Sequence, residues 1–91
     1  MELKLFELIR ECEEELDKES VEEVMHFYSH GEYEMALEGL IIEMMKAQKY
    51  PKSYNMDVLN ELVLYYRLNI ESVFDYYFWE KFTKWISERT I

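Results

Sequence analysis

The arrangement in this chain that most nearly resembles a metal site is a pair of histidines near residue 30. Glu22, His26 and His30 are spaced four residues apart, which places them along one side of a helix. Two histidines at this spacing can bind zinc, but a catalytic zinc site needs a third protein ligand and an open position. Phe27 stands where the H-E-x-x-H pattern has its glutamate. We therefore expect an exposed polar pair and no bound metal.

Other residue types that carry catalysis are present without a pattern that selects them. Cys12 falls in the apolar stripe of the first predicted helix, which is typical of a buried structural thiol rather than a nucleophile. Carboxylates are abundant, but solvated glutamates on a helix lack the burial that tunes a catalytic pKa. The sequence has neither a Gly-rich phosphate loop nor a G-x-S-x-G motif. We expect no enzymatic activity and no cofactor.

Charge divides the chain into two unlike halves. Residues 1–45 hold fourteen Asp and Glu against three Lys and Arg, a net charge of −11, whereas residues 46–91 hold six acids against seven bases, a net of +1. This sign excludes unaided binding to phosphate backbones or to anionic lipid, both of which need Lys and Arg. The distribution predicts a cationic protein partner. The alternative is a solvated face that only keeps the protein soluble.

Size and composition indicate one small domain spanning residues 1–91. Apolar residues make up 49% and aromatic residues 16% of the chain, too many for a disordered acidic tail. Two Gly and one Pro are too few for the turns of a strand-rich fold. One cysteine fits a reducing compartment, and charges interrupt any signal peptide near the start. We expect a cytoplasmic protein.

Apolar residues recur with helical period through the first half. The pattern predicts a helix over 3–17 and a second helix that begins at Ser20. Ser20 and Glu23 have the spacing of a capping box. Gly31 should end the second helix because it can adopt a positive φ. A third helix is expected over 32–48.

The third helix is apolar on more than one side. Met35, Ile42 and Met45 lie off its main apolar stripe, which predicts a central helix with neighbours on two flanks. Gly39 in its interior costs about 1 kcal/mol relative to Ala. The sequence therefore favours close approach of another helix at Gly39, with a ligand as the less favoured explanation.

The second half contains one clear loop, over residues 50–55, because Pro51 cannot continue a helix. A fourth helix is expected over 55–67. The apolar period then continues from Ile70, and this last segment is either one long helix or a helix that starts afresh at Asp75. A cap at Asp75, with Phe74 and Trp79 as a hydrophobic staple, favours the fresh start. The predicted inward residues of this last segment are Ile70, Val73, Phe74, Tyr77, Phe78, Phe82, Trp85 and Ile86. The fold class is therefore all-α, a compact single-domain bundle of four or five helices.

Aromatic residues outside these stripes have two explanations. Tyr76 and Trp79 fall off the last stripe, and Tyr50 and Tyr54 flank Pro51. Tyr and Trp are enriched at interface hot spots, which favours a binding role. The alternative is that they cover the end of a small core.

Two segments carry a resemblance to a known family. Residues 30–40, His-Gly-Glu-Tyr-Glu-Met-Ala-Leu-Glu-Gly-Leu, resemble the "hGEyexAlexL" signature of small bacterial immunity proteins of the MafI and contact-dependent growth inhibition type. Residues 72–79 are similar to sequences near the C-termini of such proteins, and the likeness covers about residues 20–86. The resemblance implies a cytosolic antidote that binds one toxin domain, often a nuclease and frequently an RNase, and blocks its active site. Binding residues do not transfer by position because contact surfaces in these families diverge quickly.

The charge distribution supplies the candidate contact residues. We expect acids at the junction of the first two helices and along the third helix to attract a basic toxin, with two aromatic residues as anchors. The protein should be a monomer that forms a one-to-one complex with the toxin. We expect no direct binding to nucleic acid or to a membrane. The candidates are Glu14, Glu15, Glu19, Glu22, Glu23, Glu32, Tyr33, Glu34, Glu38 and Trp79. The alternative function is an acidic helical interaction module or a nucleic-acid mimic that regulates a DNA-binding protein.

Overall fold

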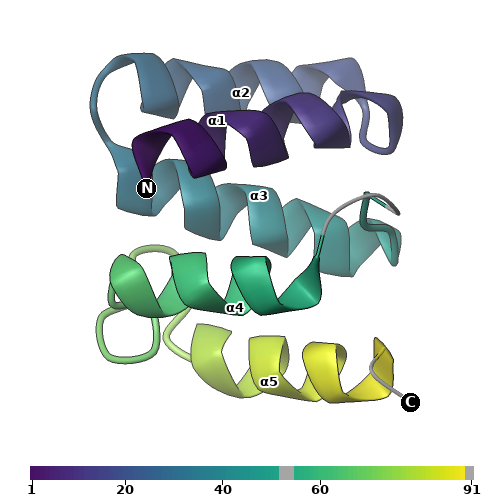
Figure 1. Ribbon diagram of the computed structural model, residues 1–91, viewed down its shortest axis with the longest axis vertical. Helices are drawn as coiled ribbons and strands as arrows, with labels where there is room; N and C mark the ends of the chain where they lie inside the picture. Colours follow the sequence, from purple (N-terminus) through teal and green to yellow (C-terminus); the bar gives the residue numbers. More distant parts are fainter. Residues whose placement is uncertain (52–54, 90–91) are drawn as a thin grey trace.

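The computed structural model describes residues 1–51 and 55–89, and these form a layered helical bundle (Figure 1). The elements are α1 (Glu2–Glu11), the 3-10 helix η1 (Cys12–Glu14), α2 (Lys18–Ser29), α3 (Tyr33–Ala47), α4 (Met56–Tyr65) and α5 (Phe78–Arg89). No strand occurs in the described part of the chain, so the prediction of an all-α bundle is confirmed. None of the helices in these residues has the length and apolarity needed to span a bilayer.

Helix α3 occupies the centre of the bundle. It lies between α1 and α2 on one side and α4 and α5 on the other (Figure 1), and it contacts all four of these helices. Its buried residues include Leu37, Leu40, Ile41 and Met44, each 1% exposed or less. The prediction of a central third helix is confirmed, and the second apolar flank of α3 is explained by its neighbours on both sides.

The turn from α2 to α3 forms as the sequence predicts. Gly31 has a φ of +75°, and its N–H donates to the carbonyl of Tyr28 at 3.0 Å. The N–H of Glu32 donates to the carbonyl of Phe27 at 3.0 Å, so two orphan carbonyls of the helix end are satisfied. This turn sets α3 antiparallel to α2.

The predicted start of the second helix is wrong. Asp17, with extended backbone, precedes the helix, and α2 begins at Lys18, so Ser20 lies inside the first turn. The Ser20 hydroxyl donates to the Glu43 carboxylate of α3 at 3.3 Å rather than capping α2. The first helix is also shorter than predicted, since it passes into η1 at Cys12.

A non-helical segment separates α4 from α5 and extends past Asp75, where the sequence favoured a break in the last segment. The side chain of Asn55 accepts the N–H of Asp57 at 2.7 Å at the start of α4. After Tyr65 the chain leaves the helix through Arg67, whose φ is 62°, and the N–H of Leu68 closes on the carbonyl of Val63 at 3.0 Å. Residues 70–77 are not helical and α5 begins at Phe78, so one long final helix from Ile70 is excluded.

Several residues that the helical period assigned to the core are exposed. Ile70, Val73, Phe74 and Tyr77 are 67%, 48%, 48% and 59% exposed. They belong to residues 66–77, called here the α4–α5 loop, where the backbone is not helical and a period of 3.6 residues has no meaning. From α5 onward the period holds, and Phe78, Phe82 and Trp85 are buried as predicted. Tyr54 lies outside the described residues.

Candidate protein-interaction surface

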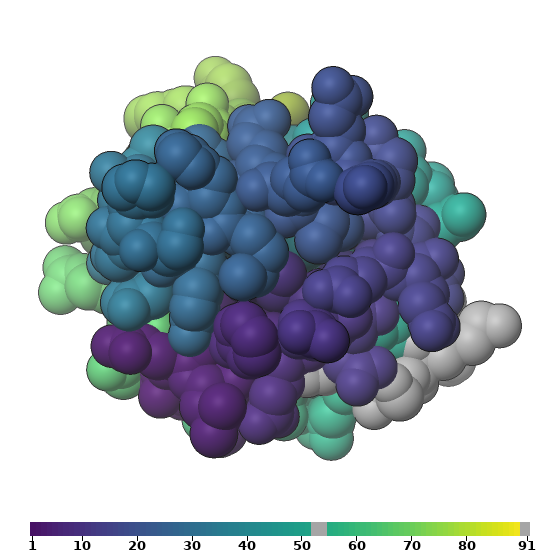
Figure 2. All heavy atoms as spheres, turned by 90° about the horizontal axis from the view of Figure 1, so that it is seen from above, coloured from purple at the N-terminus to yellow at the C-terminus, as the bar shows by residue number. Residues whose placement is uncertain are grey.

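Five of the candidate acids gather on η1, α2 and the turn between them. This acidic surface consists of Glu14, Glu15, Glu19, Glu22 and Glu23, all exposed except Glu15, which is partly buried. Those on α2 are spaced three and four residues apart and so share one side of the helix. Figure 2 views the molecule from this side, where purple and blue atoms of the first third of the chain cover most of the face.

Bases do little to neutralise this surface. Lys4 reaches across to Glu61 of α4 at 3.2 Å, and Arg10 pairs with Glu13 at 3.1 Å. Only Lys18 pairs with a member of the acidic surface, Glu22, at 3.8 Å, and both side chains are exposed. Within residues 1–51 and 55–89 the other four members form no ion pair. The negative field expected from the sequence therefore remains open to solvent.

The two histidines at the far end of α2 form a contact with each other. The rings of His26 and His30 lie 4.4 Å apart, and His30 Nδ1 is 2.9 Å from the His26 carbonyl oxygen. Both side chains are exposed. In the described residues no group of three or more His, Cys, Asp and Glu side chains is arranged to hold a metal ion. One ring nitrogen of the pair, His30 Nδ1, is therefore engaged by a backbone carbonyl of α2.

Cys12 is a buried thiol beneath the acidic surface. Its exposure is 0%, and its Sγ lies 3.9 Å from the Sδ of Met44. Burial, followed by the charges of Glu15 and Glu11, raises the pKa of the thiol to about 12. A thiol that stays protonated at neutral pH is a weak nucleophile. Its packing agrees with the structural role expected from the sequence.

The remaining candidates do not join the acidic surface. Glu32, Tyr33 and Glu34 stand at the opposite end of α2, where the chain turns into α3 (Figure 1). Trp79 is on α5, on the other side of α3 from α2, where it is partly buried with its ring 6.0 Å from Phe82. The structure therefore distributes the predicted set over separate regions.

Glu38 is not an exposed contact residue at all. Its exposure is 0%, and its carboxylate accepts the backbone N–H groups of Val73 at 2.6 Å, Phe74 at 2.8 Å and Asp75 at 2.9 Å. Successive N–H groups that converge in this way make a binding site for an anion. Charge-assisted bonds from three donors compensate for burying the carboxylate. Glu38 therefore holds the α4–α5 loop against α3, and its assignment to an exposed steering surface is wrong.

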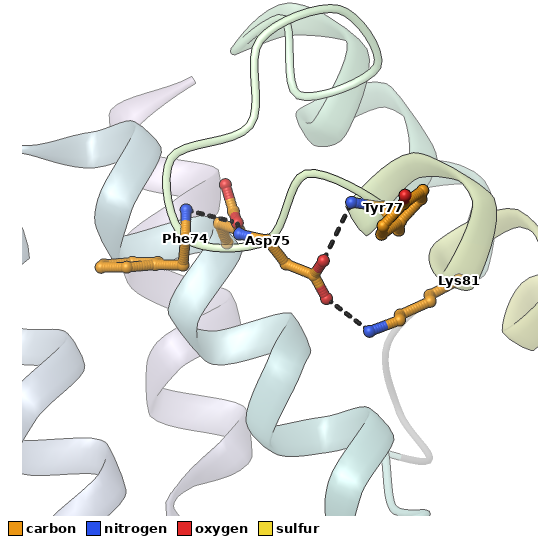
Figure 3. Close-up of polar contacts among 5 residues, drawn as sticks. Phe74, Asp75, Tyr77 and Lys81 are labelled. Atoms are coloured by element: carbon orange, nitrogen blue, oxygen red, sulfur yellow. Dashed lines mark hydrogen bonds and ion pairs between the residues drawn. The ribbon is translucent and has the colours of Figure 1, made fainter.

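Asp75 continues this arrangement into α5. Its Oδ1 accepts the N–H of Tyr77 at 2.9 Å, and its Oδ2 accepts a hydrogen bond from Lys81 Nζ at 2.7 Å (Figure 3). The bond from Lys81, and after it the bond from the Tyr77 N–H, lowers the pKa of the Asp75 carboxyl below its usual value. The expected cap of the last helix is confirmed. The expected staple is replaced by a contact of the Phe74 ring with Phe27 of α2, at 5.8 Å.

We call the Glu38 carboxylate and the three N–H groups that it accepts the Glu38 clamp. The loop that this clamp holds presents aromatic side chains to solvent. Tyr76 is 86% exposed, Tyr77 59% and Phe74 48%. The contact between Phe74 and Phe27 brings this part of the loop against the C-terminal half of α2, and light-green atoms of the later chain border the α2 face in Figure 2. An exposed aromatic patch therefore adjoins the helix that carries most of the acidic surface.

Comparison of the chain with protein-family models, with curated proteins and with solved structures found no match in any of the three.

Proposed function

We propose that the protein is an immunity protein that binds a toxin domain of basic surface and neutralises it by covering its active site, without chemistry of its own. The observation that carries the proposal is the acidic surface, whose carboxylates face solvent almost without basic partners. A nuclease presents Lys and Arg to phosphates. An acidic helical surface competes for those same groups.

The charge distribution suits capture at a distance. Complementary charge raises association above the rate of about 10⁵–10⁶ M⁻¹s⁻¹ that is usual for neutral surfaces. Rapid capture is useful for an antidote whose target arrives ready to act. The near-neutral half of the chain does not oppose this field, because its net charge is only +1.

Affinity needs desolvated contacts in addition to charge. The aromatic residues of the α4–α5 loop supply them, since Tyr and Trp dominate interface hot spots. Glu38 and Asp75 hold this loop in place before binding, which reduces the entropy lost on association. The proposed interface thus combines steering by α2 with anchoring by Phe74, Tyr76 and Tyr77.

Co-purification tests this function directly. The toxic C-terminal domain encoded beside this protein's gene should co-purify with it one to one, lose its nuclease activity in the complex, and become harmless to cells that express the protein. Release of a DNA-binding protein from DNA, with no binding to the neighbouring toxin, would instead establish the alternative of a nucleic-acid mimic. Absence of any complex with the toxin domain would reject the proposal.

A further inference from the structure

A second surface feature lies at the end of the bundle away from η1. A hollow of about 580 Å³ opens between the start of α1, the start of α3 and the end of α4. We call it the tyrosine hollow. Its lining includes Glu2, Leu3, Tyr33, Glu34, Tyr65 and Tyr66. It therefore joins three phenol rings and two carboxylates from three helices.

The hydroxyl of Tyr66 is the unusual group in this hollow. The residue is only 9% exposed, and its hydroxyl has no hydrogen-bond partner among the described residues. Burial, followed by the charges of neighbours that include Tyr65, Glu2 and Glu34, raises the pKa of this hydroxyl to about 12. These residues all line the hollow, as Tyr66 itself does. A buried hydroxyl without a partner destabilises the fold, and a ligand that donates a hydrogen bond to it would remove this cost.

The rest of the lining favours a cation as that ligand. Glu2 and Glu34 are exposed, and neither forms an ion pair within residues 1–51 and 55–89. The ring of Tyr66 lies 6.3 Å from Tyr33 and 4.9 Å from Tyr65, the latter at 86°. Faces of aromatic rings attract cations, and the attraction grows as water is excluded. The hollow thus brings the Tyr66 oxygen, two carboxylates and three tyrosine rings, of which that of Tyr65 is exposed, together around one ligand.

We infer that the tyrosine hollow binds an arginine side chain of the protein's basic partner. A guanidinium is planar, stacks on aromatic rings and carries five donors, enough for both carboxylates and the Tyr66 oxygen. A lysine ammonium is more strongly hydrated and lacks the planar stacking surface. The inference rests on the proposed function for the identity of the partner, and it adds a specific pocket at some distance from the acidic surface.

Titration with N-acetyl-argininamide tests the hollow without any partner. Saturable shifts in the NMR signals of the Tyr33, Tyr65 and Tyr66 rings are expected, and N-acetyl-glutaminamide should produce none. Tyr66→Phe removes only the hydroxyl, and Glu34→Gln removes one charge. Each should weaken binding of the probe by about tenfold, given the strength of hydrogen bonds to charged groups. Glu80→Gln, at an exposed position of α5 outside the lining of the hollow, is the matched control and should leave the affinity unchanged.

The outcomes separate this inference from the proposed function. Thermal melts confirm that each variant is folded before its affinity is compared. Equal weakening by Glu80→Gln, or equal shifts with the neutral probe, would overturn the inference. So would a toxin domain that binds Tyr66→Phe and Glu34→Gln as tightly as the unaltered protein, which leaves the proposed function standing. A protein that binds the probe in the hollow but no neighbouring toxin would remove the proposed function alone.

Discussion

The acidic surface on η1 and α2 and the Glu38 clamp on α3 use the same side chain in opposite ways. On the acidic surface, glutamates face water and leave their charge available to a partner. In the clamp a single glutamate is fully buried, and three backbone N–H groups of the α4–α5 loop compensate its charge. The comparison shows that surroundings, rather than residue type, decide whether a carboxylate holds part of the fold in place or faces solvent.

The largest difference between the two regions is expected in stability. Glu38→Gln replaces a carboxylate with an amide that has one acceptor oxygen and places an NH₂ group against backbone donors. The free energy of unfolding should fall by about 3 kcal/mol, as for other buried charged hydrogen bonds that lose a partner. Urea denaturation measures this change. Glu34→Gln, one turn away on the same helix but exposed, should change it by less than about 0.5 kcal/mol.

Equal effects of Glu38→Gln and Glu34→Gln would contradict the contrast between the two kinds of carboxylate. If the clamp positions the aromatic patch, the Glu38→Gln variant should also lose protection of the Val73, Phe74 and Asp75 amides against hydrogen exchange. Amides of α2 should keep their protection unless the whole fold is lost.

A smaller effect of the opposite sign is expected next to the clamp. A Cβ added at Gly39 would meet only the ring of Phe74, at 3.8 Å, which is an ordinary contact. The close approach of a helix that the sequence favoured is therefore wrong. Gly39→Ala should stabilise the protein by up to about 1 kcal/mol, because Ala is the better helix former. A loss of stability measured by the same denaturation would show that the loop packs more closely on α3 than the structure indicates.

The smallest expected effect is the pH dependence of Asp75. Because bonding in the folded state lowers the pKa of this carboxyl from 3.8, its stabilising contribution is present above that value. It is lost as pH falls through the lower folded-state pKa. The difference in melting temperature between the unaltered protein and Asp75→Asn should be present at neutral pH and shrink below about pH 4. Asp57→Asn, at an exposed position in the first turn of α4, serves as the control.

Most of the fold could be predicted because it follows from periodicity and local turn chemistry. Gly31 ends α2, Asp75 caps α5, and two apolar flanks make α3 central. The errors arise where local patterns compete. Asp17 precedes α2 in place of Ser20, and the apolar residues of the α4–α5 loop mimic a helical stripe in a segment that is not helical.

The candidate site was less predictable because its parts depend on tertiary contacts. Glu38 lies on the same flank of α3 as Met35, Ile42 and Met45, so a charge interrupts an otherwise apolar stripe. That interruption was the available signal that Glu38 is buried. Its partners are backbone groups 35 to 37 residues away, and no pattern of side chains in the sequence encodes them. The hollow around Tyr66 likewise exists only when three helices meet.

The salt dependence of toxin capture tests the central claim most directly. Glu22→Lys with Glu23→Lys reverses two charges on the acidic surface, and Glu80→Lys with Glu88→Lys makes the same change on exposed positions of α5. Stopped-flow association with the toxin domain that we propose as the partner should slow about tenfold at low salt for the α2 pair, and less at high salt where screening removes steering. The α5 pair should slow it less than about twofold. Equal slowing by both pairs, or association indifferent to ionic strength, would contradict the account and leave the acidic surface as a solvated face.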